Sequence, residues 1–269
     1  MSARADNRAA AALRALGIAA WLTVLAQAAP ASEIPLPERR SGYAFMRAET
    51  RAMQDDDSAN PGMLWVLDGD RLWNAKAGAA ARACADCHGD ARMSMRGVAA
   101  RYPAYDAARA RPVNLQQRIN LCRSEHQQAQ PLASESRDLL ALAAYVGRQS
   151  RGLPIAPEVD ERAKPFLEAG RAAFQRRQGQ LNLSCAQCHD DNWDRRLAGN
   201  AITQAHPNGY PIYRLEWQGL GSLQRRLRNC LVGTRTQAYD YGDAELVNLE
   251  LFLMWRARGM ILETPAVRP

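Results

Sequence analysis

The chain has very little lysine and, after its first 31 residues, no long apolar run. Of its 35 basic residues only Lys76 and Lys164 are lysine, and no basic run is interleaved with aromatic side chains, so nothing indicates nucleic-acid binding. The formal charge of +7 is a mild excess that fits a solvated surface. Strand-like alternation of apolar and polar residues is scarce, which argues against a mainly β fold.

Residues 1–31 have the composition of a secretory signal peptide. Arg4, Arg8 and Arg14 flank or precede an uncharged run at residues 15–26, and small residues follow where cleavage would occur. A membrane anchor is the alternative, but the run is shorter than the ~20 residues that a spanning helix needs. The sequence therefore predicts an exported protein, whose formal charge is +5 once the leader, with its three arginines and Asp6, is removed.

Cysteine is scarce as well, and four of the six cysteines form two copies of the pattern Cys-x-x-Cys-His, at residues 84–88 and 185–189. This is the spacing of a c-type haem attachment site, where two thiols reach the porphyrin vinyl groups and the imidazole ligates iron. Two disulfides, or one zinc site of four thiolates, give no reason for a histidine after both pairs. The motifs predict two covalently bound haem c groups, attached through Cys84 and Cys87 and through Cys185 and Cys188, with axial ligands His88 and His189.

The two motifs belong to an internal repeat, whose first copy (residues 69–152) aligns with its second copy (residues 170–259). Offsets of 101, 108 and 107 residues in turn align Gly69 with Gly170, Cys122 with Cys230, and the apolar segment 139–146 with 246–253. The apolar spacing of these closing segments is helical. We expect a mainly α fold of two tandem domains that resemble class I cytochromes c, at residues 32–152 and 153–269, joined by the Gly- and Pro-containing segment 151–157.

Methionine is rare where a second axial ligand is expected. Most small c-type cytochromes place methionine opposite the histidine, an arrangement suited to electron carriage. The first copy offers only Met93 and Met95, which follow His88 too closely to reach the opposite face of the ring. The second copy ends with Met254, in the apolar closing segment where core packing is expected, and Met260 follows it.

Cys122 and Cys230 are the better candidates, because they are equivalent in the repeat whereas His126 and His206 are not. The alternatives are two buried free thiols, or a disulfide between them. A free thiol is at risk in an oxidising compartment, and equivalent positions of two domains lie far apart unless the domains dock on those faces. We therefore expect histidine and cysteine on both irons, with thiolates that stabilise the ferric state and lower the potentials.

An arginine stands four residues before each of these cysteines, at Arg118 and Arg226. On a helix these positions share a face, so the guanidinium lies beside the sulfur, where it can lower the thiol pKa or bind an oxyanion. The second copy adds Arg225 and Arg228, for which pairing with haem propionates or a solvated face is expected. The second copy is therefore the better candidate for chemistry on an anion.

At these residues the chain resembles the SoxA family, the dihaem subunits of SoxAX cytochrome complexes, which are L-cysteine S-thiosulfotransferases. The resemblance runs from about Gly69 to the C-terminus, most specifically at residues 97–103, 118–123, 180–185, 209–215 and 221–230. It implies that Cys230, carried as a persulfide, is both the catalytic residue and the distal ligand of the second haem. It implies that Arg226 binds the substrate, and that the first haem, with His88 and Cys122, is structural or ancillary.

The resemblance also implies a reaction, partners and a compartment. Thiosulfate would be joined to a cysteine thiol of a SoxYZ-like Sox carrier protein in the periplasm, with two electrons leaving through haem. A SoxX-like monohaem cytochrome c subunit would complete a heterodimer. The alternatives are a dihaem electron-transfer cytochrome without its own substrate and a tetrathionate-forming thiosulfate dehydrogenase. A peroxidase is not expected, because thiolates on both distal faces leave no open site for peroxide.

Overall fold

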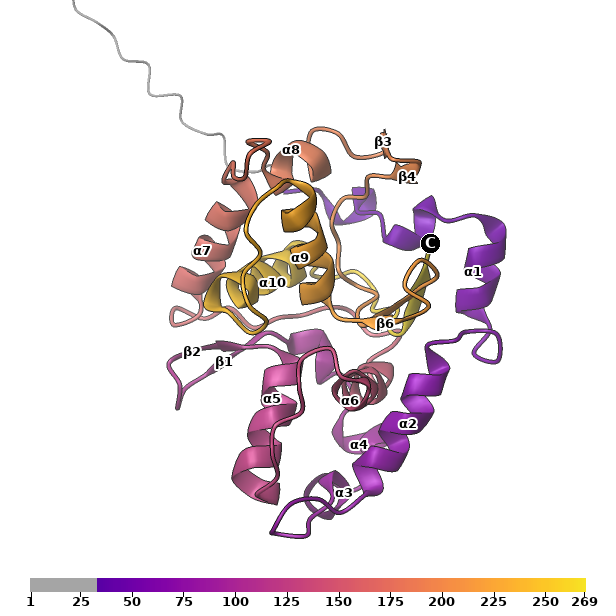
Figure 1. Cartoon of the computed structure of the whole chain (residues 1–269), viewed down its shortest axis with the longest axis vertical. Helices are drawn as coiled ribbons and strands as arrows, with labels where there is room; N and C mark the ends of the chain where they lie inside the picture. Colours follow the sequence, from indigo (N-terminus) through magenta and orange to yellow (C-terminus); the bar gives the residue numbers. More distant parts are fainter. Residues whose placement is uncertain (1–32) are drawn as a thin grey trace, which may run out of the picture. The chain divides into compact units, whose positions relative to one another are not determined.

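The computed structural model describes residues 33–269, so the predicted leader lies outside the described residues. Each copy contributes a long first helix, a short helix at the haem motif, a distal helix and a long closing helix (Figure 1). In the first copy these are α2 (Met63–Asn74), α3 (Cys84–His88), α5 (Leu115–Cys122) and α6 (Arg137–Arg148). In the second they are α7 (Lys164–Gln175), α8 (Cys185–His189), α9 (Leu223–Gly233) and α10 (Ala244–Arg256). No helix within residues 33–269 is long and apolar enough to cross a membrane.

The first and closing helices of each copy cross at a glycine. α2 packs on α6, and α7 packs on α10 (Figure 1). A Cβ atom at Gly69 would overlap the carbonyl oxygen of Ala141, and one at Gly170 would overlap that of Asn248. Residues 141 and 248 are equivalent at the 107-residue offset, so both copies use the same close approach of two helix backbones. The repeat read from the sequence is therefore a structural repeat.

A hairpin and a capped distal helix follow each haem motif. β1 (Ala104–Asp106) pairs with β2 (Arg111–Val113), and β5 (Ile212–Arg214) pairs with β6 (Gly219–Gly221). Asn114 then caps α5 by accepting from the Gln117 amide, and Ser222 caps α9 by accepting from the Arg225 amide. Side-chain acceptors at this position satisfy amides that have no partner within the helix. The caps fix where each distal helix begins, and so where Cys122 and Cys230 lie on it.

The copies differ in three places. The offset grows from 101 to 108 after the haem motif, and the seven additional residues of the second copy hold a small hairpin of β3 (Arg196–Leu197) and β4 (Asn200–Ala201). α5 ends in a π-helical turn, η4 (Arg123–Gln127), whereas α9 continues as an α-helix to Gly233. β7 (Ala266–Arg268) adds a parallel strand to β5 and has no counterpart beside β1 in the described chain.

The segment before the first copy packs against the second. It holds the short helices η1 (Leu36–Glu38), η2 (Gly42–Phe45) and α1 (Ala48–Asp55). The Arg40 amide donates to Gln204 Oε1 at 2.6 Å, and Asn60 Nδ2 donates to the Pro265 carbonyl at 2.9 Å. α1 also contacts β7. The remaining short helices, α4 (Ala91–Ser94) and η3 (Ala99–Arg101), lie within the first copy.

The expected linker is hydrogen-bonded rather than loose. Its backbone pairs with residues 259–262, because the Ile155 amide donates to the Met260 carbonyl and the Leu262 amide to the Leu153 carbonyl, at 2.9 and 3.0 Å. Ile155 is 1% exposed and belongs to a cluster of buried apolar residues that joins the two copies. Met254 and Met260 lie in the same cluster, which is the packing role expected for Met254.

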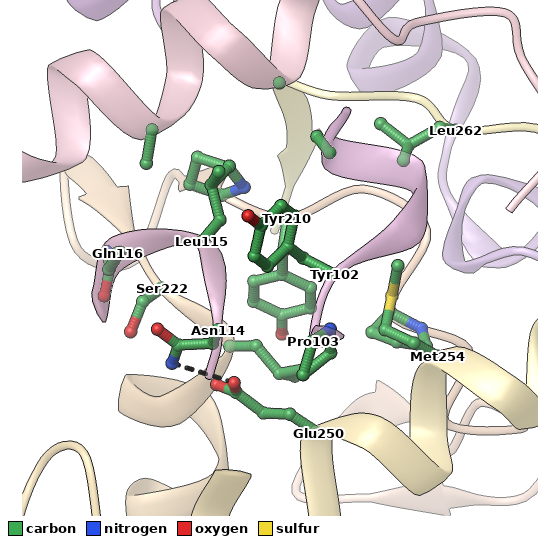
Figure 2. Close-up of a pocket in the computed structure, with 16 residues that line it drawn as sticks. Tyr102, Pro103, Asn114, Leu115, Gln116, Tyr210, Ser222, Glu250, Met254 and Leu262 are labelled. Atoms are coloured by element: carbon green, nitrogen blue, oxygen red, sulfur yellow. Dashed lines mark hydrogen bonds between the residues drawn. The ribbon is translucent and has the colours of Figure 1, made fainter. Parts of the chain in front are cut away.

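A small pocket lies between the copies and is lined by one tyrosine from each, Tyr102 and Tyr210 (Figure 2). In its wall, Asn114 Nδ2 donates to Oε2 of Glu250 on α10 at 2.9 Å. Glu250 is 5% exposed, and its burial raises its pKa to about 8. The cap of the first distal helix is thereby bonded to a buried carboxyl group of the second copy.

Candidate functional site

One cavity of about 560 Å³ gathers the predicted haem residues of the first copy. Cys84, Cys87 and His88 line it from α3, while Arg118 and Cys122 line it from α5. The volume lies within the range of about 300–1,000 Å³ that is typical of cofactor pockets. The attachment motif and the proposed distal cysteine therefore face one cavity, whose volume can hold a porphyrin.

Two of the rejected candidates also line this cavity. Met95 and His126 contribute to its wall, whereas Met93 is 81% exposed. Of the candidate axial ligands Met95, His126 and Cys122, only Cys122 has the same residue type at the equivalent position of the second copy. Its role as a ligand stays a prediction.

The haem motif of the second copy has a more strongly held histidine. His189 Nδ1 lies 2.6 Å from the carbonyl oxygen of Thr203, which follows the β3–β4 hairpin, and its N–H donates to that oxygen. This bond fixes the tautomer and leaves Nε2 available to a metal. Burial lowers the pKa of His189, which favours the neutral, ligating form. Within residues 33–269 the ring of His88 makes no hydrogen bond, although its centroid lies 5.6 Å from that of Trp73.

Cys230 lies near both attachment cysteines of its copy. Burial, and after it the negative charge of Cys230, raises the pKa of Cys185 to about 12, and the same causes raise the pKa of Cys188. All six cysteines lie in the described part of the chain and none is in a disulfide. Among residues 33–269 no three or more histidine, cysteine and acidic side chains cluster as a metal site would require.

The two arginines that precede the cysteines have different surroundings. Arg118 Nη2 forms an ion pair with Asp106 Oδ2 at 2.6 Å. Arg226, at the equivalent position, makes no side-chain hydrogen bond or ion pair with any residue from 33 to 269. Burial lowers the pKa of Arg226, but the charges of Cys230, Tyr210 and Glu216 outweigh this and raise it. A half-buried guanidinium that lies beside a sulfur and makes no ion pair can bind an external anion.

The neighbouring arginines of α9 divide in role. The guanidinium of Arg225 lies 4.2 Å from the ring centroid of Trp217, and that of Arg228 lies 4.5 Å from the ring of Tyr241. Arg228 Nη1 is buried and has no hydrogen-bond partner in the described part of the chain. A buried donor without an acceptor fits an anionic cofactor group such as a haem propionate. In contrast, His206 is buried with Nδ1 3.0 Å from the Arg40 carbonyl, on the segment that precedes the first copy.

Known proteins match this arrangement over most of the chain. The family model for the SoxA/TsdA cytochrome c domain matches twice, at residues 68–155 and 169–262. The crystal structure of SoxXA from P. pantotrophus superposes with a TM-score of 0.83 at 31% identity, over 86% of this chain and 87% of that one. The chain belongs to the SoxA family. The predicted mainly α fold of two tandem cytochrome c domains is confirmed, and such domains are those that bind haem c.

Curated relatives in this family carry one activity in their names. The protein from Pseudaminobacter salicylatoxidans is 38% identical over 92% of this chain and 87% of its own length. The protein from Rhodovulum sulfidophilum is 36% identical over 86% of this chain and 80% of its own. Both are named L-cysteine S-thiosulfotransferase subunit SoxA. The family model covers both SoxA and TsdA proteins, so it does not distinguish between them. The names of the curated relatives place this chain with SoxA.

Sequence reasoning missed two parts of the site. The acceptor for His189 is a backbone carbonyl, at Thr203, which leaves no signal in residue type. Arg214 and its neighbour Trp217 were not singled out, although the repeat aligns Arg214 with Asp106 at the offset of 108. Comparing the charges of the two copies position by position would have found it.

Proposed function

We propose that this chain is a SoxA-type subunit that oxidatively joins thiosulfate to a cysteine thiol of a Sox carrier protein. The observation that carries the proposal is the distal helix α9, which presents Cys230 and the unpaired Arg226 one turn apart over the second haem motif. The names of the curated relatives support the same reaction.

We further propose two haem c groups, one for each motif. Cys84 and Cys87 would attach the first, with His88 and Cys122 as its axial ligands. Cys185 and Cys188 would attach the second, with His189 and Cys230 as its axial ligands. When bound, the haem supplies one-electron chemistry, so the two electrons of the reaction leave through this group.

The chemistry explains why an oxidising centre is needed. A thiolate and the sulfane sulfur of thiosulfate are both electron-rich, so a bond between them forms only with the loss of two electrons. Arg226 binds the sulfonate while the sulfur of Cys230 bonds to the sulfane sulfur, and two electrons are released. The carrier thiolate then attacks the sulfane sulfur, as in thiol-disulfide exchange, and the Cys230 thiolate leaves. The carrier keeps an S-thiosulfonate, and Cys230 is regenerated.

The resting state, location and partners belong to the same proposal. The family resemblance supports a persulfide on Cys230, whose outer sulfur would then take the part given above to the cysteine sulfur. The leader at residues 1–31 supports export to the periplasm. Similarity to the SoxXA crystal structure supports a heterodimer with a SoxX-like monohaem cytochrome.

Cys230→Ser and Cys122→Ser are matched tests, because the two cysteines are equivalent in the repeat. We expect Cys230→Ser to abolish transfer of thiosulfate to the carrier thiol, and Cys122→Ser to retain it. Mass measurement of peptides should find haem attached at both motifs in each variant, and an extra sulfur on Cys230 of the wild type. Substantial transfer by Cys230→Ser would refute the role of Cys230.

The product distinguishes the remaining functions. Oxidised protein mixed with thiosulfate and carrier should yield a covalent adduct on the carrier. Tetrathionate formed from thiosulfate alone would instead indicate a thiosulfate dehydrogenase. Neither product, with haem reduction by a partner cytochrome alone, would indicate an electron-transfer protein.

A further inference from the structure

The second copy holds an arginine where the first holds a buried acid. At the offset of 108, Arg214 on β5 occupies the position of Asp106 on β1, and Arg226 occupies that of Arg118. In the first copy the side chains at these positions meet as an ion pair of 2.6 Å. In the second copy the same frame places two arginines at these positions. Burial, and next the positive charge of Arg226, lowers the pKa of Arg214, which is the effect of a nearby like charge.

Two further differences between the copies hold Arg214 in place without neutralising it. Arg109 of the first copy, which pairs with Asp106 at 3.3 Å, is replaced by Trp217 at the equivalent position. The guanidinium of Arg214 lies 5.2 Å from the Trp217 ring centroid. Val113 is replaced by Gly221, where a Cβ atom would overlap the Trp217 ring. A tryptophan ring positions a cation by its face and leaves the charge in place.

The remaining contacts of Arg214 compensate its charge in part. The residue is 8% exposed. Its Nε donates to a main-chain oxygen of Pro269, the last residue of the sequence, at 2.9 Å, and its Nη2 lies 2.8 Å from Glu216 Oε2. The Glu216 side chain is 62% exposed, so water screens this pair. Glu216 also raises the pKa of Arg226, so one exposed carboxylate serves two buried arginines, and a second anion bound between them would offset the remaining cost of burial.

We propose that Arg214 is a second substrate-binding residue, whose guanidinium binds the sulfonate end of thiosulfate together with Arg226. The inference rests on the proposed function of the Cys230 site. It adds an explanation of how that site would bind an anion with two negative charges. Thiosulfate carries two negative charges when it binds, and one arginine would leave one of them facing the electron-rich sulfur of Cys230. Two arginines neutralise the bound dianion, so its approach to that sulfur is not opposed.

Arg214→Gln tests this in the haem-loaded complex with its partner subunit and the carrier. We expect the KM for thiosulfate to rise about tenfold or more, the scale of a lost charge-assisted hydrogen bond. The turnover rate at saturating thiosulfate should fall much less. Arg214→Lys should recover most of the affinity, and calorimetric titration of the oxidised protein with thiosulfate should follow the same order. Asp106→Asn, at the equivalent position, should leave this KM unchanged.

Glu216→Gln keeps the proposal testable if Arg214→Gln does not fold. Glu216 is exposed, and removing its negative charge should strengthen the attraction of Arg214 and Arg226 for thiosulfate. The KM for thiosulfate should therefore fall. An unchanged KM and titration in Arg214→Gln, or an unchanged or raised KM in Glu216→Gln, would overturn the role of Arg214. In that case loss of transfer in Cys230→Ser and Arg226→Ala would still support the proposed function. If Cys230→Ser still transferred thiosulfate to the carrier, both the proposed function and the role of Arg214 would be overturned.

Discussion

The two copies of the repeat share a backbone frame but differ in how their charges are balanced. In the first copy Asp106 neutralises Arg118 beside Cys122. In the second copy Arg226 forms no ion pair with an acid among residues 33–269, and Arg214 stands at the position equivalent to Asp106. His189 is held by a hydrogen bond to Thr203, and no such bond holds His88 in the described chain. The repeat therefore provides a common backbone frame, and a few changes of charge distinguish its two copies at the proposed anion site.

The helix crossings are the strongest test of the shared frame. Gly69→Ala and Gly170→Ala each place a methyl group into the facing helix backbone, so we expect each to lower the free energy of unfolding by about 3 kcal/mol. Urea denaturation of the haem-loaded protein measures this. Gly233→Ala, where a Cβ atom meets nothing within 4 Å, is the control and should be neutral or slightly stabilising. A small effect at either crossing would show that the copies do not pack alike.

A buried carboxyl group distinguishes the closing helices. Glu250 on α10 has a pKa raised to about 8 by burial, whereas Ala143 is its equivalent on α6. The folded protein keeps this proton up to about pH 8, while the unfolded chain loses it near the ordinary value of 4.5. The free energy of unfolding should therefore fall as pH rises between these values, by at most about 1.4 kcal/mol per pH unit. Denaturation of Glu250→Gln across this range should lack that contribution, and an identical slope would contradict it.

The ion pair of the first copy should matter for stability and not for the reaction. Although burial alone would raise the pKa of Asp106, bonds from Arg109 and Arg118 lower it below the ordinary value. Its stabilising effect is complete above about pH 4 and is lost as pH falls through the lowered pKa. Asp106→Asn should cost about 1–3 kcal/mol at pH 7, and the gap to wild type should close in acid. A constant gap from pH 7 to pH 2 would contradict this account.

The helix caps offer the smallest and most direct comparison. Ser222→Ala should cost about 1 kcal/mol, the usual effect of a lost N-cap. Asn114→Ala should cost more, because it also removes the hydrogen bond to the buried Glu250. Thermal unfolding of the two variants measures the difference. Equal losses would mean that the bond between the copies adds nothing to stability.

Local patterns in the sequence predicted much of this structure. The closing segments at 139–146 and 246–253 are the cores of α6 and α10, which extend two or three residues beyond them at each end. The haem motifs, the distal helices and the structural repeat follow from spacing alone. The sequence did not predict that residues 33–60 pack against the second copy. This packing depends on hydrogen bonds between polar residues far apart in the chain, such as Arg40 with Gln204. The Arg214 site needed the two copies to be compared at equivalent positions.

The N-terminal segment gives the domain division a practical consequence. Residues that precede the first copy supply the acceptor for His206 and partners for Gln204 and Pro265. A fragment that begins at residue 153 would expose these polar groups to water and lose the cover of α1 over β7. Expression of residues 153–269 by themselves should therefore require residues 33–62 to be supplied as well, either as a separate peptide or by circular permutation.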